Sequence, residues 1–428
     1  MKSFYLIISL FLSTLIFAQQ PILLDTLKPH QKRVLQAKYN KRKTIFFNQI
    51  DRNHTEKEAK EIKTIFDENF KEIHDKIDQN VIVYDSPLNV YLEELTTTIQ
   101  KANVEIPKNL SILVSREYKA NASNRGEGTI VVNNYLLNAL DHEDQLVYIL
   151  CHEMAHQTLD HVLESVKSYV KANNSEDLKS KTKALKKQKY KQKTTAENLL
   201  KQIAYQNSAE NRKKEIEADS LGYIFYSRLN RDPQQVARAL EKLRDSDKEP
   251  DSLTVKDYAK IFESFGLTTK EKWFKMELFD LYHYQKSNKF NTDSLRTHPN
   301  CDVRIEHLTA IDPEIKTSKS PLTSAPSTAF SQWQYSAIYQ NIQNEYFLKH
   351  YGNSLYAALK LYNRKPDELL KKWIGLNFKK LYEAKKAYEL NRYVSQVNVS
   401  KYTDSYNLFS TFIFNLDLAD LETINKSF

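Results

Sequence analysis

The sequence predicts a mostly α-helical protein of the α+β class: a large domain with a small β-sheet, followed by a smaller helical domain. Three observations support this prediction. The 428-residue chain has only six glycines, and its long runs without helix breakers favour helices. Two short segments are rich in β-branched residues, as strands are. A stretch rich in Ser, Thr, Lys and Pro at 314–330 is typical of a linker and divides the two domains.

The N-terminal residues predict a secretory signal peptide. A single charge at Lys2 precedes the apolar run Phe4–Phe17, and Ala18 follows. This run is about 15 residues long, short of the roughly 20 that cross a bilayer. We therefore expect cleavage after Ala18, giving a signal peptide at 1–18 and a periplasmic or secreted protein. An uncleaved anchor is the alternative, and the mature chain is expected to have no membrane span.

Residues 19–313 form the predicted larger domain. Its first part carries a basic, polar leader at Lys28–Lys43. Further along, the hydrophobic pattern and one Ser-Pro helix start predict two helices and two strands. These elements are expected at Glu56–Ile77, Ser86–Ala102, Asn109–Val114 and Gly128–Val132.

The sequence His152-Glu153-Met154-Ala155-His156 lies in a run that predicts a helix. Residues four apart lie on one helix face, so His152 and His156 can direct ring nitrogens at one point, as a zinc ion requires. Glu153 lies about 100° around the axis from His152. It is placed to take a proton from a zinc-activated water as a general base.

A second helical stretch at 211–223 supplies carboxylates for the same centre. A catalytic zinc keeps three protein ligands and one open position. Glu215 and Asp219 are four residues apart and share a face, whereas Glu217 points away from them. We expect one Zn²⁺ per chain, held by the two histidines and Glu215. Asp219 is expected to orient a ligand histidine from behind.

These motifs resemble the HtpX / CAAX-prenyl-protease family of zinc metallopeptidases over roughly 85–310. The similar elements are H-E-x-x-H followed by His161, E-x-E-A-D-x-x-G at 215–222, T-H-P with a later R-I at 297–305, and the N-A and strand element at 121–132. The resemblance implies a gluzincin-type endopeptidase. The expected absence of a membrane span in the mature chain departs from the membrane-embedded members of the family and indicates a soluble, exported branch. The resemblance also implies that the strand at Gly128–Val132 is a sheet edge on which an extended substrate lies; an inner strand is the alternative. The turn at 123–128 departs from the family's usual apolar-Pro-Gly-Gly turn.

His298 precedes a proline, so it is expected in extended loop backbone. It has two candidate roles besides a purely structural one. It polarises the scissile carbonyl and stabilises the oxyanion, or it occupies the fourth zinc position and holds the enzyme latent. The two cysteines, Cys151 and Cys301, are expected as buried thiols, with one disulfide as the alternative.

Between the two zinc-binding stretches lies a lysine-rich insert at about 165–200. We interpret it as a solvated helical hairpin or a flap over the site. An acidic partner or anionic membrane surface is the alternative, and nucleic-acid binding is not expected. After the second stretch, Pro233 opens a helix to Leu243, and aromatic helical runs are expected at 258–265 and 273–284.

The C-terminal domain, 331–428, has small and aromatic residues at helical spacing. It resembles degenerate tetratricopeptide helix pairs, and a plain helical bundle is the alternative. Either would bind a protein partner or present a substrate. The functional hypothesis is thus an exported zinc endopeptidase acting on misfolded or partner proteins. The alternative is an exported folding or assembly factor whose zinc is structural or latent.

Overall fold

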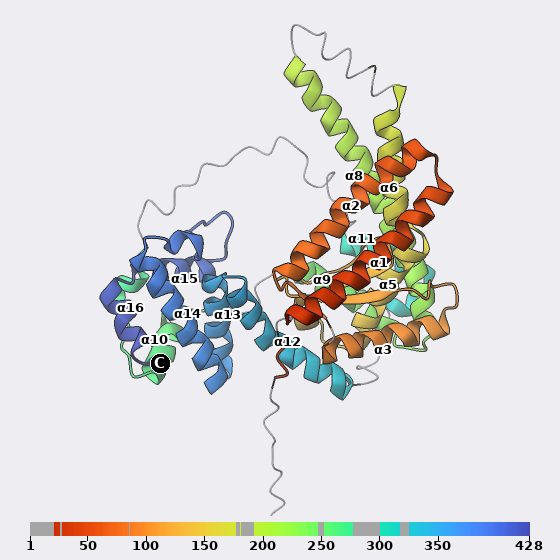
Figure 1. Cartoon of the computed structure of the whole chain (residues 1–428). Coiled ribbons are helices and arrows are strands. Elements are labelled where there is room, and N and C mark those ends of the chain that lie inside the picture. Colours follow the sequence, from red (N-terminus) through yellow and green to blue (C-terminus); the bar gives the residue numbers. More distant parts are fainter. Residues whose placement is uncertain are drawn as a thin grey trace, which may run out of the picture.

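A computed structural model describes residues 21–25, 28–84, 86–176, 180, 192–246, 252–276, 300–316 and 325–428, with only the backbone described at 192–208. Helices dominate, and four short strands form a single sheet. The predicted mostly helical α+β class is confirmed. Figure 1 shows two lobes joined by helix α12 (Thr328–Phe347). We call them the N-terminal lobe, which holds the sheet, and the C-terminal lobe, which is helical.

The sheet contains β1 (Ile82–Val83), β2 (Ser111–Ser115), β3 (Ala122–Asn124) and β4 (Thr129–Asn133), in the order β1-β2-β4-β3. β2 and β4 are parallel, and the other two pairs are antiparallel. The predicted strand at Gly128–Val132 is therefore an inner strand, and its expected position at the sheet edge is wrong. All five residues of β4 are buried, as its run of β-branched residues requires of a strand covered on both faces. The edge strand that contacts α5 (Glu143–Thr158) is β3.

Side chains alternate between the two faces of the sheet, and each face has its own core. Ile112, Val114, Ile130 and Val132 pack with α3 (Pro87–Ala102) and α5 (Glu143–Thr158). On the opposite face, Leu113 and Val131 pack against α1 (Pro29–Asn53) and α2 (Glu56–Asp78). The N-terminal lobe is thus a layer of two helices, a sheet and a larger helical layer.

The expected basic leader is instead part of a long helix, α1 (Pro29–Asn53), which pairs with α2 (Glu56–Asp78). A buried stripe of Leu35, Tyr39, Phe46 and Ile50 explains why. Its spacing of four, seven and four places these residues on one helix face against the sheet, while the lysines point to solvent. The high lysine content concealed this apolar stripe.

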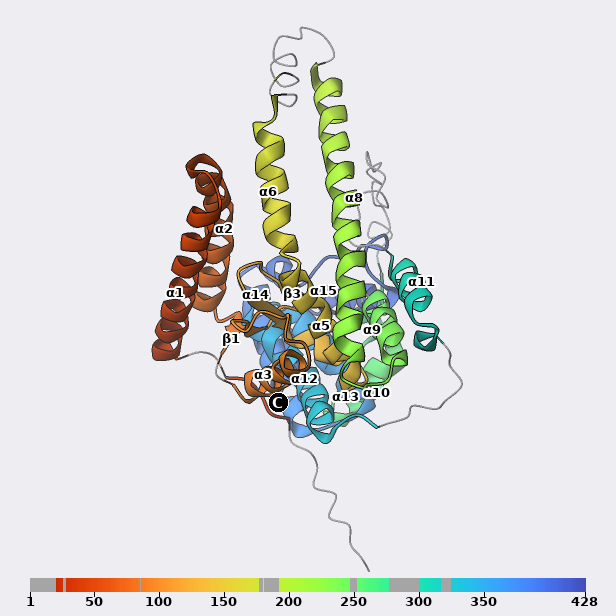
Figure 2. The ribbon, with the colours of Figure 1, turned by 90° about the vertical axis from the view of Figure 1, so that its right-hand side faces the viewer.

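The larger helical layer contains α4 (Asn134–Ala139), α5, the proximal part of α8 (Gln192–Ser227), α9 (Gln234–Asp245) and α11 (Cys301–Ile311). Figure 2 shows α6 (His161–Asn174) and the distal part of α8 projecting side by side from this lobe. They are the two arms of the predicted lysine-rich insert. The middle of that insert lies outside the described residues.

The C-terminal lobe contains α13 (Tyr351–Arg364), α14 (Glu368–Lys386), α15 (Asp404–Asn415), α16 (Leu418–Asn425) and the short helix η5 (Leu390–Arg392). α12 belongs to both lobes: Phe330 and Trp333 lie in the N-terminal core, and Ile342 lies in the C-terminal core. The short helix η4 (Pro313–Ile315) ends the N-terminal lobe.

One segment packs differently from the sequence-based division at 314–330. The helices α10 (Val255–Ser264) and η1 (Glu271–Phe274) lie in the core of the C-terminal lobe, with Tyr258 and Phe262 among its aromatic side chains. Residues 253–274 therefore pack with the C-terminal helices, although they precede the linker. Their aromatic residues complete a core that residues 331–428 alone would leave open.

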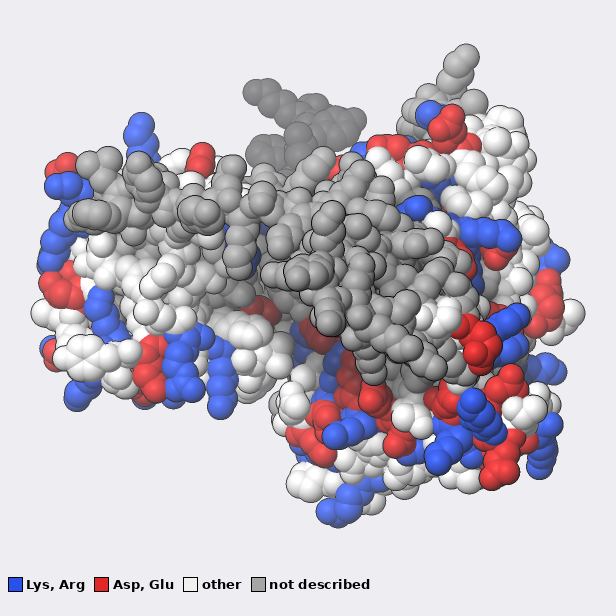
Figure 3. All heavy atoms as spheres, turned by 90° about the horizontal axis from the view of Figure 1, so that it is seen from above, with Lys and Arg blue, Asp and Glu red and all other residues white. Residues whose placement is uncertain are grey.

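Within the described residues, none of the helices combines the length and the apolar character that crossing a bilayer demands. Figure 3 shows Lys and Arg side chains interspersed with Asp and Glu over both lobes, on the face from which α6 and α8 project. Cys151 and Cys301 are free thiols, and burial raises the pKa of each.

Candidate metal centre

The candidate centre forms where α8 packs directly across α5. The close approach depends on Gly222: a Cβ at this position would lie 2.9 Å from the Cα and 3.0 Å from the backbone nitrogen of His152. Ala218, one turn earlier on α8, is fully buried in the same contact. Small residues spaced in this way let the two backbones meet. They bring the carboxylates of α8 over the histidines of α5.

The three predicted ligands converge at this crossing. The Nε2 atoms of His152 and His156 lie 3.1 Å apart. The carboxylate of Glu215 reaches both, with Oε2 3.5 Å from His152 Nε2 and Oε1 3.4 Å from His156 Nε2. All three side chains are at most slightly exposed.

These separations fit a zinc ion. Bonds of about 2.0–2.1 Å at tetrahedral angles place neighbouring ligand atoms roughly 3.3 Å apart, which is close to the three distances given above. Two imidazoles and one carboxylate are also a donor set that catalytic zinc uses, with the fourth position left open. His152, His156 and Glu215 are the one group within the described residues whose ligand atoms gather in this way.

Asp219 lies behind His152, in the position that the sequence predicts. Its Oδ1 is 3.0 Å from Nδ1 of His152 and also accepts a hydrogen bond of 3.0 Å from Tyr148. Arg304 of α11 donates to both carboxylate oxygens, at 2.7 and 2.6 Å. Burial opposes ionisation of Asp219, but Arg304 outweighs it and holds the pKa of this carboxyl well below its usual range. A charged Asp219 fixes the His152 tautomer with Nε2 turned to the metal position.

His156 is supported by a different pair of residues, which the sequence analysis did not assign. Its Nδ1 lies 3.0 Å from Nδ1 of His161, and Nε2 of His161 lies 3.3 Å from Glu217. Burial, reinforced by His156, lowers the pKa of His161 to about 4, so this ring is neutral at neutral pH. This fixes which ring nitrogens carry a proton: His156 donates from Nδ1 to His161, and His161 donates from Nε2 to Glu217.

Glu153 is held by the edge strand. The backbone N–H of Asn124 in β3 donates to Oε2 of Glu153 at 2.7 Å. Gln157, one residue after His156, accepts from the Asn124 side chain at 3.0 Å and from the N–H of Gly128 at 2.9 Å. The turn at 123–128, which departs from the resembled family, is therefore tied to α5 through Gln157. It carries β3 alongside Glu153.

His298 lies outside the described residues. The functional residues that the sequence analysis missed are Arg304, His161, Glu217 and Asn124. Three of them carried a signal, since His161, Glu217 and Arg304 belong to motifs quoted above. Assigning their contacts required the crossing of α5, α8 and α11, because the three helices are distant in sequence.

Comparison with protein-family models finds a match over the centre of the chain. The model of peptidase family M48 matches residues 88–312, which is more than half of the 428 residues. The matched region begins in α3 and ends after α11, so it contains β2–β4, both helices of the metal centre and Arg304. A search of curated proteins finds no match to this chain.

Proposed function

We propose, from the premise that this chain belongs to peptidase family M48 and is therefore a metallopeptidase, that it is a zinc-dependent endopeptidase. The observation that carries the proposal is the spacing of the three ligand atoms at the α5–α8 crossing, 3.1–3.5 Å apart. This spacing suits zinc and leaves a fourth coordination position beside these three ligands. Glu153 lies in the same helix, adjacent to the first ligand.

In this proposal His152, His156 and Glu215 hold the zinc ion, which when bound supplies a Lewis acid and lowers the pKa of water towards neutrality. Glu153 takes a proton from the attacking water and passes it to the leaving amine of the scissile peptide bond. The Asn124 N–H keeps the Glu153 carboxylate on the side of the edge strand. Asp219 and His161 keep both ligand rings in the tautomer that directs Nε2 at the metal.

The substrate that suits this site is an extended polypeptide. β3 pairs with β4 through Asn121 and Arg125, whose backbone groups point towards β4. Because outward and inward groups alternate along an antiparallel strand, the N–H and C=O of Ala122 point the other way. That side is the one from which Asn124 reaches Glu153. A peptide that adds to this edge would place its backbone beside the general base.

We further propose that the protein is exported and cleaves misfolded or partner proteins, with the C-terminal lobe contacting the partner. The apolar run at Phe4–Phe17 and the small residue Ala18 support export. Sequencing the N-terminus of the mature protein from its native source tests this part. A chain that begins at Gln19 is expected, whereas a retained Met1 would contradict it.

The zinc endopeptidase proposal is tested with internally quenched peptides whose two termini are blocked. Cleavage between internal residues is expected from the purified chain, lost after removal of metal with a chelator and restored by zinc. Cleavage that survives complete metal removal would refute zinc dependence. Cleavage confined to peptides with a free terminus would refute the endopeptidase assignment.

A further inference from the structure

A pocket of about 490 Å³ lies between the two lobes, and we call it the interlobe pocket. The N-terminal lobe contributes Tyr118 and Lys119, from the segment before β3, and Tyr135 of α4. The C-terminal lobe contributes residues of α12, α13 and the segment 395–406. Its volume is within the range of about 300–1,000 Å³ that ligand sites occupy, and domain interfaces are common places for such sites.

The walls of the interlobe pocket are cationic. Lys119, Lys360, Arg364 and Lys401 line it, and among its described lining residues there is neither Asp nor Glu. Lys360 lies 5.1 Å from the ring centre of Tyr356, and Lys401 lies 4.9 Å from that of Tyr402. On the face drawn in Figure 3, the two signs of charge are interspersed among the described residues. Four cationic side chains that line one pocket attract an anionic ligand.

The pocket also contains a buried hydrogen-bond donor. Asn341 of α12 is only 4% exposed, and its Oδ1 accepts from Asn134 at 3.2 Å. Among the described residues, its Nδ2 has no hydrogen-bond partner. A buried amide nitrogen is costly to leave unpaired, and such groups often serve a ligand. Nδ2 is closed off from solvent, so a carbonyl or carboxylate oxygen in the pocket satisfies it only when the Asn341 side chain turns towards the pocket.

The interlobe pocket lies next to the start of the edge strand β3. Lys119 precedes Ala122 by three residues, and its carbonyl accepts from the side chain of Asn133 at the end of β4. A peptide lying along β3 therefore continues, within about 10 Å of chain, to this cationic wall. We propose that the interlobe pocket binds an acidic stretch of the polypeptide substrate, at a distance from the bond that is cleaved.

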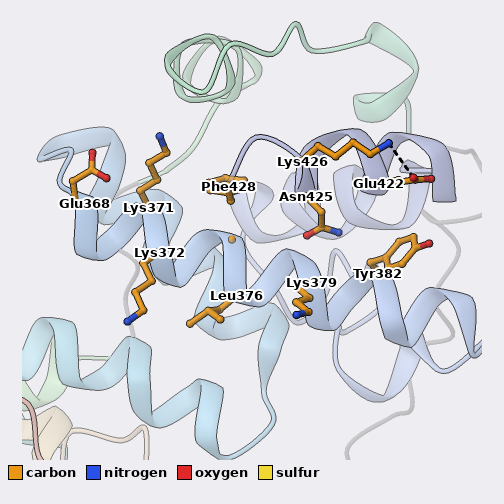
Figure 4. A pocket seen from close by; sticks show the side chains of 11 residues that line it. Glu368, Lys371, Lys372, Leu376, Lys379, Tyr382, Glu422, Asn425, Lys426 and Phe428 are labelled. Carbon is orange, nitrogen blue, oxygen red and sulfur yellow. Dashed lines mark ion pairs between the residues drawn. The ribbon is translucent and has the colours of Figure 1, made fainter.

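A second groove, of about 780 Å³, shows what distinguishes the interlobe pocket. It lies between α14 and α16 and receives no residue from the N-terminal lobe (Figure 4). Lys371, Lys372 and Lys379 line it together with Glu368, and Lys426 pairs with Glu422 at 3.0 Å. Its charges are mixed, and it is not continuous with β3. Its lysines provide a matched control.

The proposal rests on the proposed endopeptidase activity for the identity of the ligand, but binding is measured without cleavage. A fluorescein-labelled oligoglutamate peptide is titrated with the full chain carrying Glu153→Gln, and anisotropy is recorded at low and high salt. Saturable, salt-sensitive binding is expected. Lys360→Gln/Lys401→Gln is expected to weaken it by about fivefold or more. Lys371→Gln/Lys372→Gln, which removes the same number of lysines from the second groove, is expected to leave it unchanged.

Three results of the binding assay would overturn the proposal: the absence of saturable binding, an equal loss in both double variants, or stronger competition by an oligothymidylate than by unlabelled oligoglutamate. The last result would indicate a nucleic-acid site instead. A separate cleavage assay with the wild-type chain compares one substrate sequence with a glutamate tract or a serine tract attached at either end. A higher kcat/KM with the glutamate tract at one end is expected. Equal rates with both tracts refute this inference alone, whereas failure to cleave either substrate refutes the proposed function.

Discussion

His161 is predicted to set the zinc affinity although it is not a ligand. His161→Phe keeps a ring of similar size but removes the acceptor that lies 3.0 Å from Nδ1 of His156. Leaving a buried donor unpaired costs about 1–3 kcal/mol, and about 1.4 kcal/mol corresponds to tenfold in an equilibrium constant. Loss of such a supporting partner typically costs 10–100-fold in metal affinity. We therefore expect the zinc dissociation constant to rise by about 10–100-fold.

The assay is competition for zinc with a chromophoric chelator at neutral pH. His161→Gln is expected to recover part of the affinity, because its amide oxygen can accept from His156. The control is His307→Asn. His307 of α11 also contacts α8, with Nε2 2.8 Å from Oγ of Ser220, but it touches no ligand. Circular dichroism checks the fold of each variant. A folded His161→Phe variant that binds zinc as tightly as the wild type would refute the reasoning.

Two further predictions concern stability. Gly222→Ala should force α8 away from α5, because the new Cβ would meet backbone atoms of His152 at 2.9–3.0 Å. We expect the free energy of unfolding, measured in urea, to fall by about 1–3 kcal/mol and zinc binding to weaken. An unchanged unfolding midpoint would contradict this prediction. In the C-terminal lobe, burial opposes ionisation of Asp420, but bonds from Lys270 and Trp273 outweigh it and lower its pKa to about 2. The stability from this carboxylate is present above its unfolded pKa of about 3.9 and is lost as pH falls towards 2. The difference in unfolding free energy between the wild type and Asp420→Asn should therefore shrink over that pH interval. A difference that stays constant there would contradict this prediction.

Much of the metal centre follows from helix periodicity in the sequence. The spacing of four between His152 and His156, and between Glu215 and Asp219, fixes which side chains share a face. That relation is local, and it holds wherever a helix forms. Periodicity within one helix does not predict which helices pack across one another. Arg304 reaches Asp219 only because α11 packs onto α8, and Glu217 meets His161 only because α8 packs beside α6.

The order of the strands in the sheet could not be predicted from the sequence either. The β-branched run at Thr129–Val132 indicates a strand but does not tell which neighbours it has. The structure places it between β2 and β3, so the edge falls to the short strand Ala122–Asn124, whose sequence has little strand character. At the N-terminus, composition concealed periodicity. Leu35, Tyr39 and Phe46 lie among many lysines and arginines, and their regular spacing is the signal that predicts α1.

Domain division by composition also differs from division by packing. The Ser- and Pro-rich stretch at 314–330 has the composition of a linker, but α12 passes from one core to the other soon after it. Residues 253–274 pack with helices that follow them by a hundred residues or so in sequence, as with Trp273 and Phe412, whose ring centres are 5.9 Å apart. Such long-range pairing depends on shape complementarity between aromatic side chains, which a single sequence does not display.

The central claim is that Glu153 is the general base at a zinc centre. The most direct measurement compares hydrolysis of an unfolded protein by the mature wild-type chain and by Glu153→Gln, with zinc content determined in both. We predict equal zinc content, cleavage by the wild type, and a loss of at least about 100-fold in the variant. Glu153→Gln that binds zinc and cleaves at the wild-type rate would contradict the account.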